Sequence, residues 1–256
     1  MASRDLQTIY VMWLRDVKGF FRSRIRLITT LIVPFSLLCF ISFGFNAGFR
    51  LPGMPENINY LDFAAPGILG MTMLFGSIFA GMSVLWDREF GFLKEMIVAP
   101  VHRWAIVIGR IVGGVTTVFI QGLLILLIAL LIGFKVLNPY GIAITFLFMF
   151  LIGVGFVGFG VALASIIEDT QAFSLLMQII ISPTIFLSGA FFPLSSLSWW
   201  IRLISMANPL VYGVDGLRYG LINSSQFPIY LNLSVLIAFD ILMIILSSWF
   251  FSKNKG

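Results

Sequence analysis

Six long apolar runs, separated by shorter polar stretches, constrain the fold of this chain more than any other feature. Several exceed the roughly 20 apolar residues that a helix needs to cross a bilayer, in a chain that is 59% hydrophobic with 27 Phe. The ten-residue alternation of a membrane β-barrel is absent, so the runs predict helices. We expect an all-α membrane protein with six transmembrane helices in one domain, residues 1–256. The predicted spans cover residues 27–45, 63–85, 106–134, 140–167, 172–192 and 229–251.

The N-terminal residues 3–24 precede the first span and show the pattern of a surface helix. Apolar residues such as Leu6, Trp13 and Phe20 recur at helical spacing, and basic residues occupy the remaining positions. A basic amphipathic helix with Trp on its apolar side lies along a membrane surface. We therefore expect an N-terminal interfacial helix.

Residues 86–104 form a charged island between the second and third spans. In a helix, Phe90, Leu93 and Ile97 fall on one face, opposite Arg88 and Glu95, and Pro100 ends the helix. Such a helix could lie passively at the interface or dock a soluble partner. The mixed charge and the proline favour docking. The charged residues of the island are Asp87, Arg88, Glu89, Lys94, Glu95 and Arg103.

Residues 193–228 form the longest stretch that does not span. They hold the Trp199–Trp200 pair and a short apolar segment, 201–207, followed by Asn208 and Pro209. That segment is too short to cross a bilayer. We expect a re-entrant or interfacial helical pair here.

The distribution of basic residues predicts the orientation. Six spans place both termini on one side, and twelve of the sixteen Lys and Arg residues fall on that side. Positive residues are enriched in cytoplasmic loops, so we expect cytoplasmic termini, a cytoplasmic island and a multi-pass protein of the cytoplasmic (inner) membrane. The net charge of +5 is then a topology signal, and no nucleic-acid partner is expected. The basic residues on the other side are Arg50, Lys135, Arg202 and Arg218.

The motifs of an enzyme are missing from the sequence. The single His, His102, has no His, Cys or Asp partners at metal-ligand spacing. No GxxxxGK[ST] phosphate loop and no hydrolase motif is present. We expect no catalytic residue, no metal and no directly bound cofactor.

Asp240 lies in the middle of the sixth predicted span, where a carboxylate costs about 2.5–3.5 kcal/mol on insertion scales. It could contact a proton or substrate inside the bundle; alternatively, it could be a buried acid that bonds to a hydroxyl or amide of a neighbouring helix or is protonated outright. The second interpretation is favoured. Gln121 and Gln178 complete this possible intramembrane polar site, and packing hydrogen bonds are favoured for both.

Two long blocks carry a resemblance to a known family. The segment DREFGFLKEMIVAPVHRWAIVIGRIVGG (87–114) resembles the first cytoplasmic loop of ABC-2 type exporter permeases. The segment LSGAFFPLSSLSWWIRLISMANPLVYGVDGLRYG (187–220) resembles the region from the exit of their fifth span to their NP-x-x-Y segment. The order of six spans after a surface helix matches as well, so the resemblance covers nearly the whole chain.

The resemblance implies a half-transporter that dimerises in the lipid bilayer and pairs with two copies of a separate ATP-binding subunit, which holds the ATP and Mg. It also implies a role for each segment between spans. The coupling helix to the ATPase would use Arg88, Glu89, Phe90, Phe92, Leu93, Lys94, Glu95 and Ile97. The connecting helix would use Trp13, Arg15, Lys18 and Phe20. The external re-entrant pair would use Trp199, Trp200, Arg202, Asn208, Pro209 and Tyr212.

The cargo is the least determined part of the function. The segment RDVKGFFRSR (15–24) matches poorly the N-terminal DxxxRY pattern of the polysaccharide exporters in the family. The chain looks closer to daunorubicin-type permeases, and an aromatic, largely uncharged bundle suits a hydrophobic or amphipathic, drug-like or lipid-linked cargo. Export of a polysaccharide or glycolipid is the main alternative. A non-transporting scaffold or channel is the alternative of another class, and association with an ATPase distinguishes it.

Overall fold

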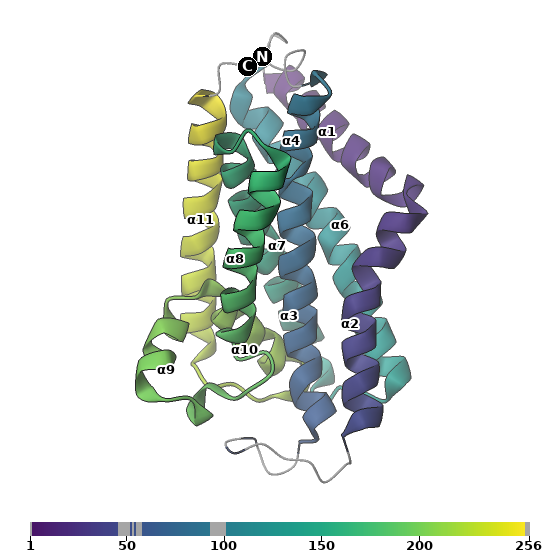
Figure 1. Ribbon diagram of the computed structural model, residues 1–256, viewed down its shortest axis with the longest axis vertical. Coiled ribbons are helices and arrows are strands. Elements are labelled where there is room, and N and C mark those ends of the chain that lie inside the picture. The colour runs from purple at the N-terminus through teal and green to yellow at the C-terminus, as the bar shows by residue number, and fades with distance from the viewer. Residues whose placement is uncertain (1, 46–51, 53, 55–57, 93–100, 254–256) are drawn as a thin grey trace.

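The computed structural model describes residues 2–45, 52, 54, 58–92 and 101–253, and all regular structure within these ranges is helical. The helices run mostly along the long axis of a bundle, with the start of α1 and the end of α11 at the same end (Figure 1). The elements are α1 (Ala2–Arg22), α2 (Arg24–Gly44), α3 (Tyr60–Gly81), α4 (Ser83–Glu89), α6 (Arg103–Ile132), η1 (Pro139–Gly141), α7 (Ile142–Ile166), α8 (Thr170–Phe186), η2 (Leu194–Ser196), α9 (Trp199–Met206), α10 (Pro209–Ile222) and α11 (Ile229–Lys253).

Four of the described helical segments are long and apolar enough to cross a membrane. They are Tyr60–Glu89, Arg103–Ile132, Pro139–Ile166 and Ile229–Lys253. Two shorter apolar helices remain: Ile28–Gly44 falls within the first predicted span, and Thr170–Phe186 overlaps the fifth but begins two residues before it. The prediction of an all-helical membrane protein is confirmed.

The fifth apolar helix is shorter than the predicted span 172–192. Helix α8 ends at Phe186, and Gly189 has a φ of 74°. This left-handed backbone suits glycine and turns the chain before residue 192. The helix has 17 residues, fewer than the roughly 20 of a full span.

Helix α3 occupies the centre of the bundle. In its apolar window 78% of residues are buried, against 22% for α11, and α3 packs on α2, α6, α7 and α10. Small residues allow the close approach: a Cβ added to Gly81 would lie 2.6 Å from Cα of Gly160 on α7. Membrane helices associate through such packing because lipid tails are as apolar as the helices.

The structure divides the charged island. Trp86 belongs to α4, which begins at Ser83 and ends at Glu89, and Gly91 has a φ of 79°. Because a left-handed residue interrupts a right-handed helix, no single helix runs unbroken from residue 86 through residue 92. Residues 93–100 lie outside the described part of the chain. The next helix, α6, begins at Arg103.

Away from the termini, α9 and α10 form a pair of short helices where residues 193–228 predicted one (Figure 1). Asn208 caps α10, its Oδ1 accepting from the N–H of Leu210 at 3.0 Å, and Pro209 is the first residue of the helix. Helix α10 is buried among α3, α7 and α11. Helix α9 exposes its apolar residues, with Trp199 80% and Trp200 53% accessible.

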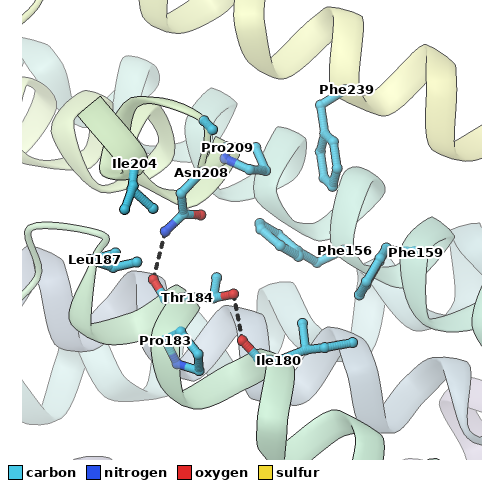
Figure 2. Close-up of a pocket in the computed structure, with 11 residues that line it drawn as sticks. Phe156, Phe159, Ile180, Pro183, Thr184, Leu187, Ile204, Asn208, Pro209 and Phe239 are labelled. Atoms are coloured by element: carbon cyan, nitrogen blue, oxygen red, sulfur yellow. Dashed lines mark hydrogen bonds between the residues drawn. The ribbon is translucent and has the colours of Figure 1, made fainter. Parts of the chain in front are cut away.

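A pocket of about 290 Å³ lies between α8 and the α7–α11 pair, bordered by α9 (Figure 2). Its walls are mostly apolar. The polar residues in its lining are Thr184 and Asn208, and both are engaged: Asn208 Nδ2 donates to the carbonyl of Thr184 at 2.7 Å, and Thr184 Oγ1 donates to the carbonyl of Ile180 at 2.7 Å. A pocket of this size and lining suits a small apolar ligand or one hydrocarbon chain. The apolar lining residues are Phe156, Phe159, Ile180, Pro183, Leu187, Ile204, Ala207, Pro209 and Phe239.

Candidate functional site: a charged junction at one end of the bundle

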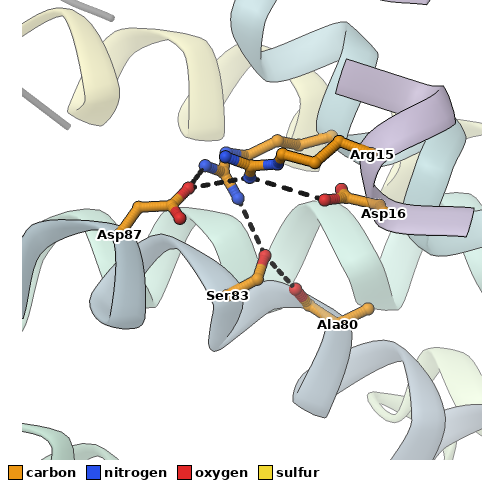
Figure 3. A network of polar contacts seen from close by, with 6 residues as sticks. Arg15, Asp16, Ala80, Ser83 and Asp87 are labelled. Carbon is orange, nitrogen blue, oxygen red and sulfur yellow. Dashed lines mark hydrogen bonds and ion pairs between the residues drawn. The ribbon is translucent and has the colours of Figure 1, made fainter. Parts of the chain in front are cut away.

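Asp87 on α4 forms ion pairs with two arginines, each from a different helix. Nη2 of Arg15 on α1 lies 2.8 Å from Asp87 Oδ2 (Figure 3). Arg110 on α6 pairs with the same carboxylate oxygen, and its side chain is only 1% exposed. The carboxylate therefore joins α1, α4 and α6 at a single point.

The same cluster satisfies further polar groups. Nη1 of Arg110 donates to Ser83 Oγ at 2.9 Å, and Ser83 Oγ donates to the carbonyl of Ala80 at 2.7 Å. Arg15 also lies 3.4 Å from Asp16. Two arginines and two aspartates balance in charge, which offsets the cost of burying them. We call Arg15, Asp16, Ser83, Asp87 and Arg110 the charged junction.

The next two residues of α4 extend this connection to α7 and α8. Arg88 donates from Nη1 to the carbonyl of Ile167 at 3.0 Å and from Nη2 to the carbonyl of Ser165 at 3.3 Å. The carboxylate of Glu89 accepts from the hydroxyl of Thr170, the first residue of α8. Helix α4 is thus tied to α1, to α6 and to the turn between α7 and α8.

The start of α6 is held from both ends of the chain. Asp5 on α1 accepts from the backbone N–H of His102 at 3.2 Å, and its Oδ2 lies 2.9 Å from His102 Nδ1. The hydrogen bond from this N–H is the largest influence on Asp5 and lowers the pKa of its carboxyl, against the opposing effect of burial. Arg103 donates to the carbonyl of Ser252 on α11.

Beside the junction, two apolar side chains of the island lie on the surface. Phe90 is 73% exposed and Phe92 51% exposed. Exposed aromatic residues next to charged groups are typical of a surface that binds a protein partner. The other residues predicted for the coupling helix, namely Leu93, Lys94, Glu95 and Ile97, lie outside the described residues.

The four residues predicted for the connecting helix face different neighbours. Trp13 donates from Nε1 to Thr116 Oγ1 on α6 at 3.0 Å, Phe20 is buried, and Arg15 belongs to the junction. Lys18 is exposed. Helix α1 is therefore packed firmly on α6 along one side only.

The residues predicted for the external pair lie at the other end of the molecule. Asn208 bonds to α8 as described above, and the Tyr212 hydroxyl donates to the carbonyl of Met206 at 2.9 Å. Pro209 starts α10. Arg202 is exposed, like Trp199 and Trp200.

Sequence reasoning missed two buried charges on α10. Arg218 donates from Nη2 to the carbonyl of Gly189 at 2.9 Å and lies 3.9 Å from the ring centroid of Phe63. Asp215 accepts from the N–H of Gln226 at 2.8 Å and from Asn232 Nδ2 at 2.9 Å. Charged residues within an otherwise apolar segment were the available signal.

The residues of the possible intramembrane polar site face different surroundings. Asp240 is buried beside Gly155 of α7, and its Oδ1 has no hydrogen-bond partner in the described part of the chain. Gln121 is buried beside Gly76 of α3. Gln178 is exposed on α8. The three residues therefore have different neighbours and do not form a single polar site in the described part of the chain.

Comparison with known proteins assigns the chain, including the segments around α4, to a family. The profile of the ABC-2 type transporter family matches residues 7–222. The chain belongs to this family. Among relatives of this ABC-2 permease, a transport permease, ycf38, of Cyanophora paradoxa is 32% identical over 84% of the chain and 74% of the relative. The inner membrane transport permease YadH of Escherichia coli is 25% identical over 96% of the chain and 94% of the relative.

A third relative carries a more specific name. YbhR of Escherichia coli, named as a multidrug ABC transporter permease, is 26% identical over 62% of the chain and 43% of the relative. The family predicted from residues 87–114 and 187–220 is confirmed. The proteins of this family are transport components, and in ABC transporters the ATPase activity lies in separate partner subunits.

Proposed function

We propose that this chain is the transmembrane subunit of an ATP-driven exporter that moves a hydrophobic or amphipathic cargo outward from the cytoplasm. A separate ATP-binding subunit, present in two copies, would hold the ATP and Mg. One observation carries the proposal: the described start of the charged island is rigidly tied, through Asp87, Arg88 and Glu89, to α1, α6 and the turn between α7 and α8.

This arrangement suits the transmission of force. A soluble partner can move the spans only through a rigid element outside the bilayer. Phe90 and Phe92 offer it an exposed apolar contact, and α4 continues directly from α3, the central helix. Movement of Phe90 would therefore displace Asp87 and the two arginines that it holds. In this proposal the coupling residues predicted within 93–100, which lie outside the described part of the chain, also contact the partner, and α1 is the connecting helix.

The proposed topology concerns the end of the bundle where α1 starts and α11 ends. In this proposal the four long helices and the two shorter apolar helices each cross the membrane once, so that the start of α1, the charged junction and the end of α11 lie on one side; their position at the same end of the bundle supports it. The excess of basic residues there makes that side cytoplasmic, and the name of YadH supports the inner membrane. In a background with Cys39→Ser, Ser196→Cys should react with an impermeant thiol reagent added from outside. Labelling only after lysis would reverse the orientation.

The cargo class rests on the apolar pocket and on the name of YbhR. A pocket whose polar atoms are internally bonded favours a drug-like molecule or a lipid chain over a sugar. Polysaccharide or glycolipid export would need hydrogen-bonding groups elsewhere on the pathway. In the proposal the permease also pairs with a second copy of itself, with α9 and α10 forming the external re-entrant pair near the exit.

Co-purification tests the proposal most simply. The tagged chain is isolated from its native membranes and the ATPase activity of what accompanies it is measured. We expect a stoichiometric soluble subunit that hydrolyses ATP. A chain that purifies alone and recruits no ATPase would support the scaffold or channel alternative instead, with Asp240 as the residue to study.

A further inference from the structure

Helix α1 turns all of its acidic side chains inward. Asp5 is 5% exposed and contacts His102, and Asp16 lies against α6, where a Cβ added to Gly113 would be 3.0 Å from Asp16 Cβ. Met12 and Phe20 are buried on the same side. The acids are therefore paired within the protein and do not contribute to the outer surface of the helix.

The outer surface of α1 carries only positive charge among its described side chains. Arg4, Lys18 and Arg22 are exposed. Their separations of 14 and 4 residues are close to whole turns of a helix with 3.6 residues per turn, so the three side chains lie along one stripe. We call Arg4, Lys18 and Arg22 the basic stripe.

An exposed apolar stripe runs beside the basic one. Leu6 is 68% exposed, Tyr10 58% and Phe21 55%. Figure 1 shows α1 slanting across the outside of the bundle between its charged end and the start of α2. Paired basic and apolar stripes are the arrangement with which a helix lies in a membrane interface, with its apolar residues among the acyl chains and its cations at the headgroups.

A hollow lies next to the first cation of the stripe. It has a volume of about 360 Å³ and is lined by Arg4, Gln7, Thr8, Val11, Met12 and Val101. The guanidinium of Arg4 and the amide of Gln7 can donate to a phosphate headgroup, whereas the hydroxyl of Thr8 already donates to the carbonyl of Arg4 at 2.9 Å. The apolar residues of the lining suit the start of the lipid chains.

We propose that the basic stripe of α1 binds anionic phospholipid headgroups, and that this binding holds Arg15 of the same helix in its contact with Asp87. Arg15 lies three residues before Lys18 and reaches the junction from α1. Loss of the headgroups would loosen α1 and weaken the link between α4 and α1. That the basic stripe binds anionic headgroups is independent of the proposed function. That this binding strengthens the link between α1 and α4, and so affects coupling, rests on the proposed function.

An acidic surface of a soluble protein is the other partner that a basic stripe could fit. The neighbouring apolar stripe favours the membrane, because Leu6, Tyr10 and Phe21 would remain exposed to water beside a soluble partner that covered only the cations. Charge complementarity and apolar burial are satisfied together at an anionic membrane surface.

The test measures lipid preference directly. The full-length permease is placed in phosphatidylcholine bilayers, and the association of spin-labelled phosphatidylglycerol is compared with that of spin-labelled phosphatidylcholine. We expect a preference for phosphatidylglycerol that falls with added salt. Arg22→Gln should reduce it by up to roughly fivefold, the effect of one cation near an anionic surface, and Arg4→Gln/Arg22→Gln should reduce it further.

Lys135→Gln is the matched control, because it removes one exposed cation at the opposite end of α6. It should leave the preference unchanged. Equal losses in Arg22→Gln and Lys135→Gln would overturn the proposal and assign the preference to net charge. So would a preference that is absent in the wild type or retained in Arg4→Gln/Arg22→Gln.

A second measurement separates the two classes of partner. If Arg4→Gln/Arg22→Gln weakens recruitment of the ATPase in detergent without anionic lipid, the basic stripe belongs to the protein partner and the lipid proposal is overturned. Failure to recruit any ATPase would count against the proposed function alone, since lipid association is measured on the permease by itself.

Discussion

Asp87 is the residue on which the charged end of the molecule depends. It pairs with Arg110, which is almost fully buried, and with Arg15, whose side chain is 38% exposed. Removing one partner of a buried ion pair leaves an uncompensated charge, which is more destabilising than removing both. The exposed Arg15 contributes less because water screens it.

We therefore predict that Asp87→Asn destabilises the permease by about 3 kcal/mol, the low end of the range for a broken buried pair, because Asp16 still balances part of the charge. Thermal unfolding in detergent measures the change. Asp169→Asn is the control: it makes the same substitution at the exposed N-cap of α8, where Asn caps about as well as Asp. Equal losses in the two variants would show that the junction is not specially stabilising.

The contact of Asp5 on α1 with His102 at the start of α6 should make the stability of the protein depend on pH, and the direction of that dependence can be predicted. Its pKa lies below the ordinary 3.8 because the His102 N–H donates to its carboxylate. The stabilisation is therefore present above about pH 4 and is lost as the pH falls through the lower pKa of the folded protein. Measured from about pH 5 downward, so that protonation of the neighbouring histidine does not add to the change, the difference in thermal stability between the wild type and Asp5→Asn should shrink below about pH 4. A difference that grows as the pH falls from about 5 would contradict this assignment.

At the scale of the helices, the crossing of α3 and α7 is set by two glycines. Alanine at Gly81 would place a Cβ 2.7 Å from the backbone nitrogen of Val161, where the neighbouring atoms belong to a packed helix. We predict that Gly81→Ala costs about 1–3 kcal/mol, the usual range for overpacking, measured by thermal unfolding.

Gly153 provides the matched control for that substitution. An alanine Cβ there would lie 3.4 Å from a methyl carbon of Val115, an ordinary contact with a side chain. Gly153→Ala should not destabilise the protein and could stabilise it by up to about 1 kcal/mol, because alanine is more favourable than glycine inside a helix. If both alanines are tolerated equally, the close approach at Gly81 does not determine the crossing.

The helices themselves were largely predictable, and their ends and partners were not. Apolar length predicted α6, α7 and α11 almost to their observed bounds because insertion into lipid depends on the local sequence. The early end of α8 depends on the turn at Gly189, and the division of the island depends on Gly91. Neither backbone conformation follows from hydrophobicity.

The partners of the buried charged residues could not be predicted from the sequence. Arg218 was counted among the basic residues of the outer side from the order of the spans, and its burial between Phe63 and the carbonyl of Gly189 was not predicted. Arg88 was placed on the polar face of the island, and its partners are two backbone carbonyls near the end of α7. Contacts with backbone atoms distant in sequence leave no pattern in the residues that make them.

For the whole molecule, we propose that ATP hydrolysis in a partner drives transport through α4. In this proposal the exposed Phe90 would receive the partner, Asp87 would pass the movement to α1 and α6, and Arg88 and Glu89 would pass it to α7 and α8. The charged junction and the exposed aromatic residues would then act as one unit. Substitution of the exposed residues would therefore reduce the coupling of ATP hydrolysis to transport without preventing folding.

The most direct test measures transport and ATP hydrolysis together, in proteoliposomes that hold the permease and its ATP-binding subunit. Glu89→Ala/Phe90→Ala should lower cargo moved per ATP hydrolysed by roughly tenfold or more, the effect of truncating an aromatic anchor at an interface, with normal membrane insertion. Phe43→Ala, at an 80% exposed phenylalanine near the far end of α2, should leave the ratio unchanged. Unchanged coupling in Glu89→Ala/Phe90→Ala would contradict the role of α4 as the point where the partner acts.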